Sequence, residues 1–270
     1  MLLLSSASCM DDTGRYGQDN RNYRITASIE DANVASRVAD KNNRTSFTKN
    51  DEIFIGWSGS ASYKYLCSGT DNVFVPNASD ANRELWTGLL NASSTKEVYA
   101  WYGTMSSTLP AVGTNISIPP DQTSDSKMLS AICMAAHQSA SSTTNTLDFT
   151  FHHLTARLFI SVDVVDDIVM QEDVMGATAR LNRIYTAGNV ATDTSSKEYL
   201  LNVPTDKAGT GSIRMNRSWS DQEAFHLDFE CLLPPQILGE EQNVTIILAN
   251  GKEYDCHCLL YTSDAADDTP

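Results

Sequence analysis

The sequence predicts an all-β protein with few short helices, built from β-sandwiches. Three observations lead to this fold class. Apolar and polar residues alternate over short segments, as in strands with one buried face. Ser, Thr, Asn and Asp are frequent between these segments and favour turns. One segment, residues 79–90, has the spacing of a short amphipathic helix, with Ser79 or Asp80 as its N-terminal cap.

The first half of the chain contains the clearest strand patterns. Residues 23–29 alternate strictly, with Ile25, Ala27 and Ile29 on one face and polar residues on the other. Other segments are apolar, rich in aromatic residues or stopped by prolines, and are expected to be strands: 52–57, a hairpin over 63–75, 98–102 and 116–120. Residues 128–136 fit either a helix or a strand.

The second half continues the β pattern. Alternation over residues 147–151 shifts at His152-His153 and resumes over 156–164, which a β-bulge at the two histidines explains. Further strands are expected at 199–203, 212–215 and 225–232, and in a hairpin over 244–254 with a turn at Asn250-Gly251. The Ser/Thr/Asn run at 139–146 is the best candidate for a linker. It divides the chain into an N-terminal domain, 23–146, and a C-terminal domain, 147–257.

The charge of the chain excludes some partners. The 270 residues contain 34 acidic and 19 basic side chains, for a formal net charge of −15. Such a surface repels phosphate backbones, so no nucleic-acid partner is expected. An anionic membrane surface is a poor partner for the same reason. The sequence also has no apolar run of the roughly 18 residues that a transmembrane helix needs.

The N-terminal segment resembles the end of a bacterial lipoprotein signal. Small residues precede Cys9 in Ser6-Ala7-Ser8-Cys9, although Ser6 departs from the usual Leu or Val. The acidic pair Asp11-Asp12 resembles the surface-export signal of Bacteroidetes lipoproteins. We therefore expect residues 1–22 to be the remnant of a signal and a tether, with lipidation at Cys9. The alternative is a free or buried N-terminal cysteine.

The C-terminal segment looks foreign to the rest of the chain. Residues 258–267 resemble a translated sequencing-library adapter. We expect residues 258–270 to be a non-native tail, which would leave the C-terminal domain incomplete. The alternative is a natural acidic tail.

Motifs for catalysis or metal binding are largely missing from the sequence. It contains no phosphate-binding glycine loop, HExxH, GxSxG or EF-hand pattern. His152 and His153 are adjacent, so on a strand they point to opposite faces and do not share a metal. Asp163, Asp166 and Asp167 fit a solvated loop better than a calcium or catalytic site. We predict no enzyme activity, no catalytic or metal-ligating residue and no cofactor.

Cysteine and tryptophan residues leave two questions open. Cys67, Cys133, Cys231 and Cys256 either pair in an exported protein or are buried free thiols. Trp57, Trp86, Trp101 and Trp219 either stack on sugars at the surface or lie in the core, the commoner case.

From about Ile25 to Tyr254 the chain resembles the fimbrillin family of Bacteroidetes, the major and minor fimbrium subunits. Each motif is weak alone, but their order over about 230 residues is specific. Asn50 departs from the family, which favours Gly there, and so does Gly103, where Pro is frequent. The matching elements are Arg37-Val38, Phe47, Asp51-Glu52-Ile53, Ile55-Gly56, Tyr99-Ala100-Trp101-Tyr102, Pro119-Pro120 with Gln122, Phe149 to Leu158, Leu233-Pro234-Pro235-Gln236 and Gly251-Lys252 with Tyr254.

This resemblance implies two tandem transthyretin-like β-sandwich domains and a structural role in a fimbrium, or pilus. Subunits of this kind are exported as lipoproteins to the outer membrane, cut after an arginine by a trypsin-like protease, and joined to other fimbrial subunits by strand exchange. Residues 23–37 would then be a removable strand and pro-segment. Arg37 is the expected cleavage site and Arg44 the alternative, since both follow the strand at 23–29.

Two other functions remain as alternatives. A monomeric surface lipoprotein or tip adhesin would bind host or dietary glycans or proteins, so its partner would be a host surface ligand. A glycosidase would need two carboxylates at a fixed separation. Two further strands after Tyr254 in the natural protein would favour a polymerising stalk subunit.

Overall fold

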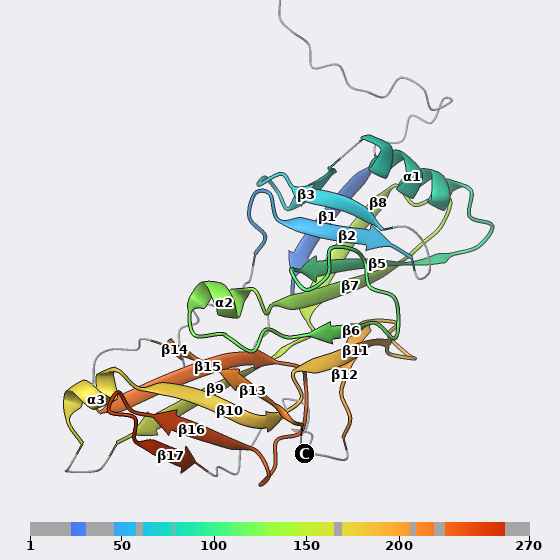
Figure 1. Ribbon diagram of the computed structural model, residues 1–270. Helices are drawn as coiled ribbons and strands as arrows, with labels where there is room; N and C mark the ends of the chain where they lie inside the picture. Colours follow the sequence, from blue (N-terminus) through green and yellow to red (C-terminus); the bar gives the residue numbers. More distant parts are fainter. Residues whose placement is uncertain are drawn as a thin grey trace, which may run out of the picture.

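The computed structural model describes residues 23–30, 46–57, 62–77, 79–164, 169–205, 209–218 and 225–256. Figure 1 shows two β-rich lobes with a third, smaller sheet between them. The described residues contain 17 strands and three helices, which confirms the all-β fold with few short helices. None of these helices is long and apolar enough to cross a membrane.

The N-terminal lobe is one seven-stranded sheet that closes into a barrel. Its strand order is β1-β4-β3-β2-β5-β7-β8, and the barrel closes because β1 pairs with both β4 and β8. The sequence predicted a sandwich here, and this double pairing joins the strands into a single sheet. The strands are β1 (Arg24–Ile29), β2 (Glu52–Gly56), β3 (Tyr63–Cys67), β4 (Val73–Pro76), β5 (Lys96–Gly103), β7 (Cys133–Ala140) and β8 (Thr146–His153).

The helix predicted at residues 79–90 is present as α1 (Ser79–Leu90) and lies against this barrel. Its buried face carries Leu85, Trp86 and Leu89, at the one-turn spacing that defined the prediction. Asn50 has φ = 72°, in the left-handed region. Gly and Asn tolerate that conformation best, so the departure from the family's glycine retains the backbone geometry.

The C-terminal lobe is a β-sandwich, as predicted. One sheet has the order β14-β15-β9 and the other β13-β10-β16-β17. Side chains from both sheets form the core, among them Ile160, Phe229, Leu181 and Ile246. The strands are β9 (Ala156–Asp163), β10 (Thr178–Ile184), β13 (Gly211–Arg214), β14 (Asn216–Ser218), β15 (His226–Leu233), β16 (Asn243–Ile247) and β17 (Glu253–Cys256), and the helix α3 (Gln171–Met175) precedes β10.

The third sheet covers the outside of the barrel. It consists of β6 (Asn115–Ser117), β11 (Ala187–Thr192) and β12 (Tyr199–Asn202). Its side chains pack on Tyr99 and Trp101 of β5, while Val98 and Ala100 of the same strand face the barrel interior. Because β5 is buried on both faces, residues 98–102 form a continuous apolar run.

The division between the lobes differs from the predicted boundary at residues 146 and 147. β8 belongs to the barrel, and Leu147, Phe149 and Phe151 lie in the barrel core. The expected linker at 139–146 is instead the end of β7, a turn and the start of β8, with Ser141 N–H donating to Thr144 Oγ1 at 2.9 Å. The chain leaves the barrel after His153 and enters β9 at Ala156, so it changes sheets where a bulge was expected.

Two open questions from the sequence are resolved in the described residues. The segment 128–136 is both helix and strand, because α2 (Asp125–Leu129) ends within it and β7 begins at Cys133. Cys67, Cys133 and Cys231 are buried free thiols, and burial raises the pKa of Cys133 and Cys231.

Candidate assembly interface

Strand β1 has two unequal partners in the barrel. It pairs in parallel with β8 over six residues, from Arg24 opposite Thr146 to Ile29 opposite Phe151. Its antiparallel pairing with β4 covers only Ile25 opposite Phe74 and Thr26 opposite Val73. The segment is therefore held mainly by β8, and it is the strand that completes the barrel.

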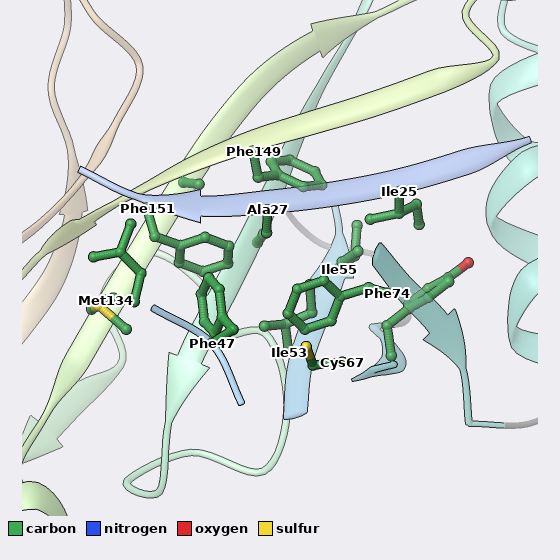
Figure 2. Close-up of a cluster of buried hydrophobic side chains, with 14 of the residues drawn as sticks. Ile25, Ala27, Phe47, Ile53, Ile55, Cys67, Phe74, Met134, Phe149 and Phe151 are labelled. Carbon is green, nitrogen blue, oxygen red and sulfur yellow. The ribbon is translucent and has the colours of Figure 1, made fainter. Parts of the chain in front are cut away.

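The inner face of β1 lies on an aromatic core. Ile25, Ala27 and Ile29 are buried, as the alternation predicted. Figure 2 shows Ile25 and Ala27 on the side of the strand that faces the rings of Phe47, Phe74 and Phe151. The ring of Phe47 contacts those of Phe74 and Phe151 edge to face, at centroid distances of 5.2 and 5.3 Å. Burying an isoleucine side chain contributes about 1.5–3 kcal/mol.

Hydrogen bonds fix both ends of β1. Arg24 N–H donates to Asn145 C=O at 3.0 Å, and Glu30 N–H donates to Phe151 C=O at 2.8 Å. On the outer face, the Thr26 hydroxyl donates to Asp148 Oδ1 at 2.6 Å. Removing β1 would therefore leave backbone groups of β8 without partners and would open an apolar groove. Such a groove accepts another extended strand.

The structure does not describe the predicted lipidation and cleavage residues. Cys9, Arg37 and Arg44 lie outside the described residues, as do the expected tail at 258–270, Trp219, Asp166 and Asp167. Among the other tryptophans, Trp86 and Trp101 are buried, and Trp57 is half-buried with Lys96 Nζ 4.2 Å from its ring centroid.

Beside the barrel, a polar contact joins the two lobes. Gln122, which follows Pro119-Pro120, has a buried side chain that pairs with the main chain of Leu232 on β15. Its Nε2 donates to Leu232 C=O at 2.7 Å, and its Oε1 accepts from Leu232 N–H at 2.8 Å. The other glutamine after two prolines, Gln236, pairs in the same way with Tyr185, at 2.9 Å in both directions. Both glutamines belong to motifs that carry the family resemblance. The motifs alone did not explain what these side chains do in the structure.

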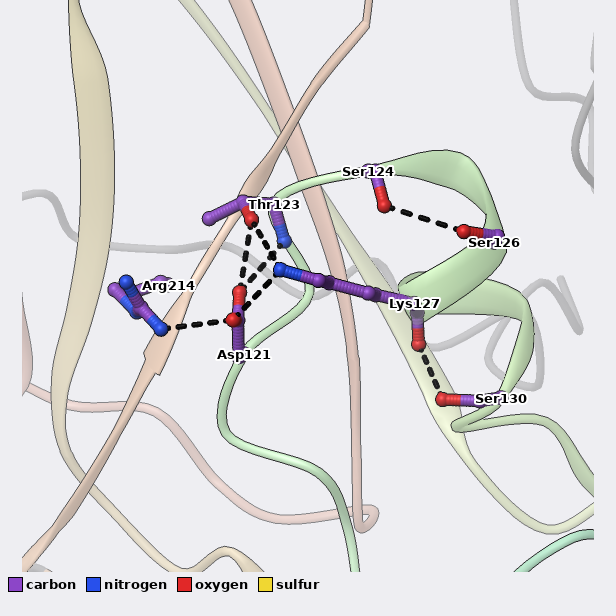
Figure 3. A network of polar contacts seen from close by, with 7 residues as sticks. All are labelled: Asp121, Thr123, Ser124, Ser126, Lys127, Ser130 and Arg214. Carbon is purple, nitrogen blue, oxygen red and sulfur yellow. Dashed lines mark hydrogen bonds and ion pairs between the residues drawn. The ribbon is translucent and has the colours of Figure 1, made fainter.

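Asp121 extends this contact at the surface, as Figure 3 shows. Its carboxylate accepts from Lys127 Nζ and lies against Arg214 of β13, both at 2.8 Å. The hydrogen bond from Lys127 is the main cause that lowers the pKa of Asp121 to about 2, followed by that from Thr123, with a smaller contribution from the charge of Arg214. The residues that join the lobes were not predicted as a contact, because they come together only in the fold.

The histidines and acidic residues singled out in the sequence occupy separate places. His152 Nε2 lies 3.1 Å from Tyr199 C=O, and Asp163 Oδ1 lies 2.6 Å from His226 Nδ1. Within the described ranges, no group of three His, Cys, Asp or Glu side chains is placed to hold a metal ion.

A cleft of about 410 Å³ lies between the end of β8, the strand β12 and the loop after β15. Among the described residues, its lining includes His152, His153 and Gln236 but no Asp, Glu, Lys or Arg side chain. Two apolar side chains at its rim are exposed, Leu200 at 39% and Ile237 at 81%. The sequence did not indicate this cleft, because its residues come from four separate segments of the chain.

Solved structures with the same fold define the class of protein. A candidate cell adhesion protein from Bacteroides ovatus matches with a TM-score of 0.59 and 14% identity, over 88% of this chain and 86% of that one. Another from Bacteroides uniformis matches with a TM-score of 0.54 and 15% identity, over 88% and 84%. At these identities the likeness shows the fold alone. The chain is thus a two-lobed, all-β protein with the fold of these candidate adhesins.

The family follows from the sequence match. The fimbrillin-like family model matches residues 36–261, and the chain belongs to that family. It is therefore a fimbrillin-like protein of the cell surface. No curated protein matches it.

Proposed function

We propose that this chain is a structural subunit of a cell-surface fimbrium and has no catalytic role. In this proposal it reaches the outer membrane as a lipoprotein through Cys9. A trypsin-like protease then cuts it after Arg37, or after Arg44, and it joins other fimbrial subunits by strand exchange to serve adhesion.

The observation that carries the proposal is the position of β1. It is the first strand of the barrel, it lies ahead of both arginines in the chain, and it contributes Ile25, Ala27 and Ile29 to the barrel core. A cut after either arginine would convert this strand from a covalent part of the barrel into a bound peptide. A strand from another subunit could then replace it without a net loss of backbone hydrogen bonds.

An arginine-specific protease tests the exchange. The expected result is a cut in the segment 31–45, followed by release of the N-terminal fragment when an excess of a peptide with residues 23–30 is added. The control replaces Arg37→Lys and Arg44→Lys, which retains both charges and removes both cleavage sites in that segment. A cut chain that retains its N-terminal fragment through long incubation with the peptide would reject strand exchange. Mass measurement of the cut chain distinguishes the two arginines.

Lipidation has a separate test. With a complete signal peptide in front, Cys9→Ala should move the protein from the membrane fraction to the soluble fraction. The acyl chains must supply the membrane affinity, because a surface of net charge −15 does not. Unchanged fractionation would reject the anchor.

The cleft, whose described lining is mostly apolar, favours a second candidate function, that of a surface lipoprotein or tip adhesin. Clefts of about 300–1,000 Å³ with a mostly apolar lining commonly hold ligands. A screen of neutral glycans and peptides against the 270-residue chain tests this function, with Ile237→Asp expected to abolish any binding at the cleft. Val112→Asp is the matched control, since Val112 is exposed and lies outside the lining. Binding that survives Ile237→Asp would exclude the cleft.

A further inference from the structure

We propose that the groove under β1 selects its incoming strand by size: a large, a small and a large apolar side chain at alternate positions. The small residue takes the place of Ala27, opposite Phe149. This inference rests on the proposed strand exchange and specifies which partner strands the groove admits.

The small position follows from the surroundings of Ala27. This residue is 1% exposed and pairs with Phe149 on β8, with Phe151 two residues further along. The side chains of Phe149 and Phe151 both point into the barrel and are fully buried, and Figure 2 shows Ala27 among these rings. A larger side chain at this position would need space that the rings already fill.

The rings are not free to move aside. The Phe151 ring lies 6.4 Å from that of Phe149 and 5.3 Å from that of Phe47, both edge to face. Phe47 also contacts Phe74 and Tyr102 edge to face, at 5.2 and 5.6 Å. Moving one ring to admit a leucine would disturb the others. The whole aromatic cluster therefore limits the size of the side chain at position 27.

The two large positions follow from the flanking residues. Ile25 and Ile29 are 2% and 7% exposed and pair with Leu147 and Phe151. A smaller side chain at either position would leave a cavity over the rings, which costs stability. The residues between them, Thr26 and Ser28, are less buried and face outward, so they are not restricted in size in the same way.

Peptide binding to the cut chain tests the selection. Fluorescein-labelled peptides of residues 23–30 are compared by anisotropy in three forms: natural, Ala27→Leu and Ser28→Leu. The two variants add the same side chain at adjacent residues, but only Ala27 faces the rings. Ala27→Leu should weaken binding at least about tenfold. Ser28→Leu should change it less than about threefold. Equal binding of the two variants would overturn the inference.

The same substitutions in the uncut chain test the size selection independently of strand exchange. Ala27→Leu should lower the urea midpoint, while Ser28→Leu should leave it near that of the natural chain. If even the natural peptide fails to bind the cut chain, strand exchange is wrong, and the uncut variants still decide the size selection. Equal midpoints for the two variants would overturn the selection whether or not peptides bind.

Discussion

At the scale of single residues, the outer face of the β9–β15 pair contains a histidine between two carboxylates. His226 Nδ1 lies 2.6 Å from Asp163 Oδ1, and its Nε2 lies 3.1 Å from Asp228 Oδ1. The hydrogen bond to Asp163 is the main cause that raises the pKa of His226 above its usual 6.5. Desolvation opposes it, and the charges of Asp228 and Asp163 add to it.

This arrangement predicts how stability depends on pH. Because the pKa of His226 is raised in the folded state, its contribution is fully present below pH 6.5 and is lost as the pH rises through the folded value. NMR titration of the imidazole should give a pKa above 6.5. Asp163→Asn should lower that pKa, since it removes both the hydrogen bond to the carboxylate and the charge. A pKa at or below 6.5 in the natural chain would contradict this account.

At the scale of elements, the packing of α1 limits one of its own residues. A Cβ atom added at Gly88 would lie 2.4 Å from an atom of the Trp57 ring. In an exposed helix, replacing Gly by Ala stabilises by about 1 kcal/mol. Overpacking costs about 1–3 kcal/mol, and we expect it to dominate here because Tyr63 and Lys96 hold the Trp57 ring in place.

Gly88→Ala should therefore lower the free energy of unfolding measured in urea. Adding Trp57→Leu to Gly88→Ala should recover part of that loss, because the ring that blocks the Cβ atom is gone. A Gly88→Ala chain more stable than the natural one would show that helix propensity dominates at this position.

Elements were predictable from the sequence where alternation runs unbroken. β1, β2, β12 and the β16–β17 hairpin lie where their patterns indicated. β10 was not predicted, because its alternation breaks at Arg183, which has φ = 61° and lies at a shift in register. The residues of β11 are mostly small, and its buried Val190 packs with Tyr199 and Leu201 of β12 and with Tyr99 and Trp101 of the distant strand β5. The Ser/Thr/Asn run at 139–146 has the composition of a linker, but turns share that composition, and the structure has a turn between β7 and β8 there.

The candidate site was predictable in part for the same reason. The inner face of β1 could be inferred from its own alternation. Its parallel partner could not, because Thr26 and the Asp148 that it contacts are 122 residues apart in the chain. The interlobe glutamine Gln122 and the cleft also depend on segments that only the fold brings together.

At the scale of the whole molecule, the lobes should unfold together. Gln122 makes two hydrogen bonds across the lobes to a buried main chain, and Asp121 adds an ion pair with Arg214. Leaving a buried donor or acceptor unpaired costs about 1–3 kcal/mol.

Gln122→Leu should thus lower stability by a few kcal/mol and separate the two lobes in urea. Tryptophan fluorescence reports mainly on the barrel through Trp57, Trp86 and Trp101, whereas circular dichroism reports on the whole chain. The two curves should coincide in the natural chain and diverge in Gln122→Leu. Gln171→Leu on the exposed surface of α3 is the control and should leave both unchanged. Coincident curves in Gln122→Leu would show that other contacts couple the lobes.

The pairing of β1 with β8 also leads to an expectation about the order in which the barrel folds. β1 is the first strand of the barrel in sequence and β8 the last, so their contacts span about half the chain. Contacts of such long range form slowly, because closing a long loop costs entropy before any pairing repays it. As the chain emerges, the barrel strands β2, β3, β4, β5 and β7 have neighbours to pair with before β8 exists, whereas β1 lacks its longer partner until β8 follows. We therefore expect β1 to be the last strand to pair fully, and the six-stranded sheet without it is the same arrangement that the proposed cut and loss of β1 would leave. If the proposed strand exchange is right, a barrel that pairs its N-terminal strand last would be open to an outside strand while it folds as well as after the cut.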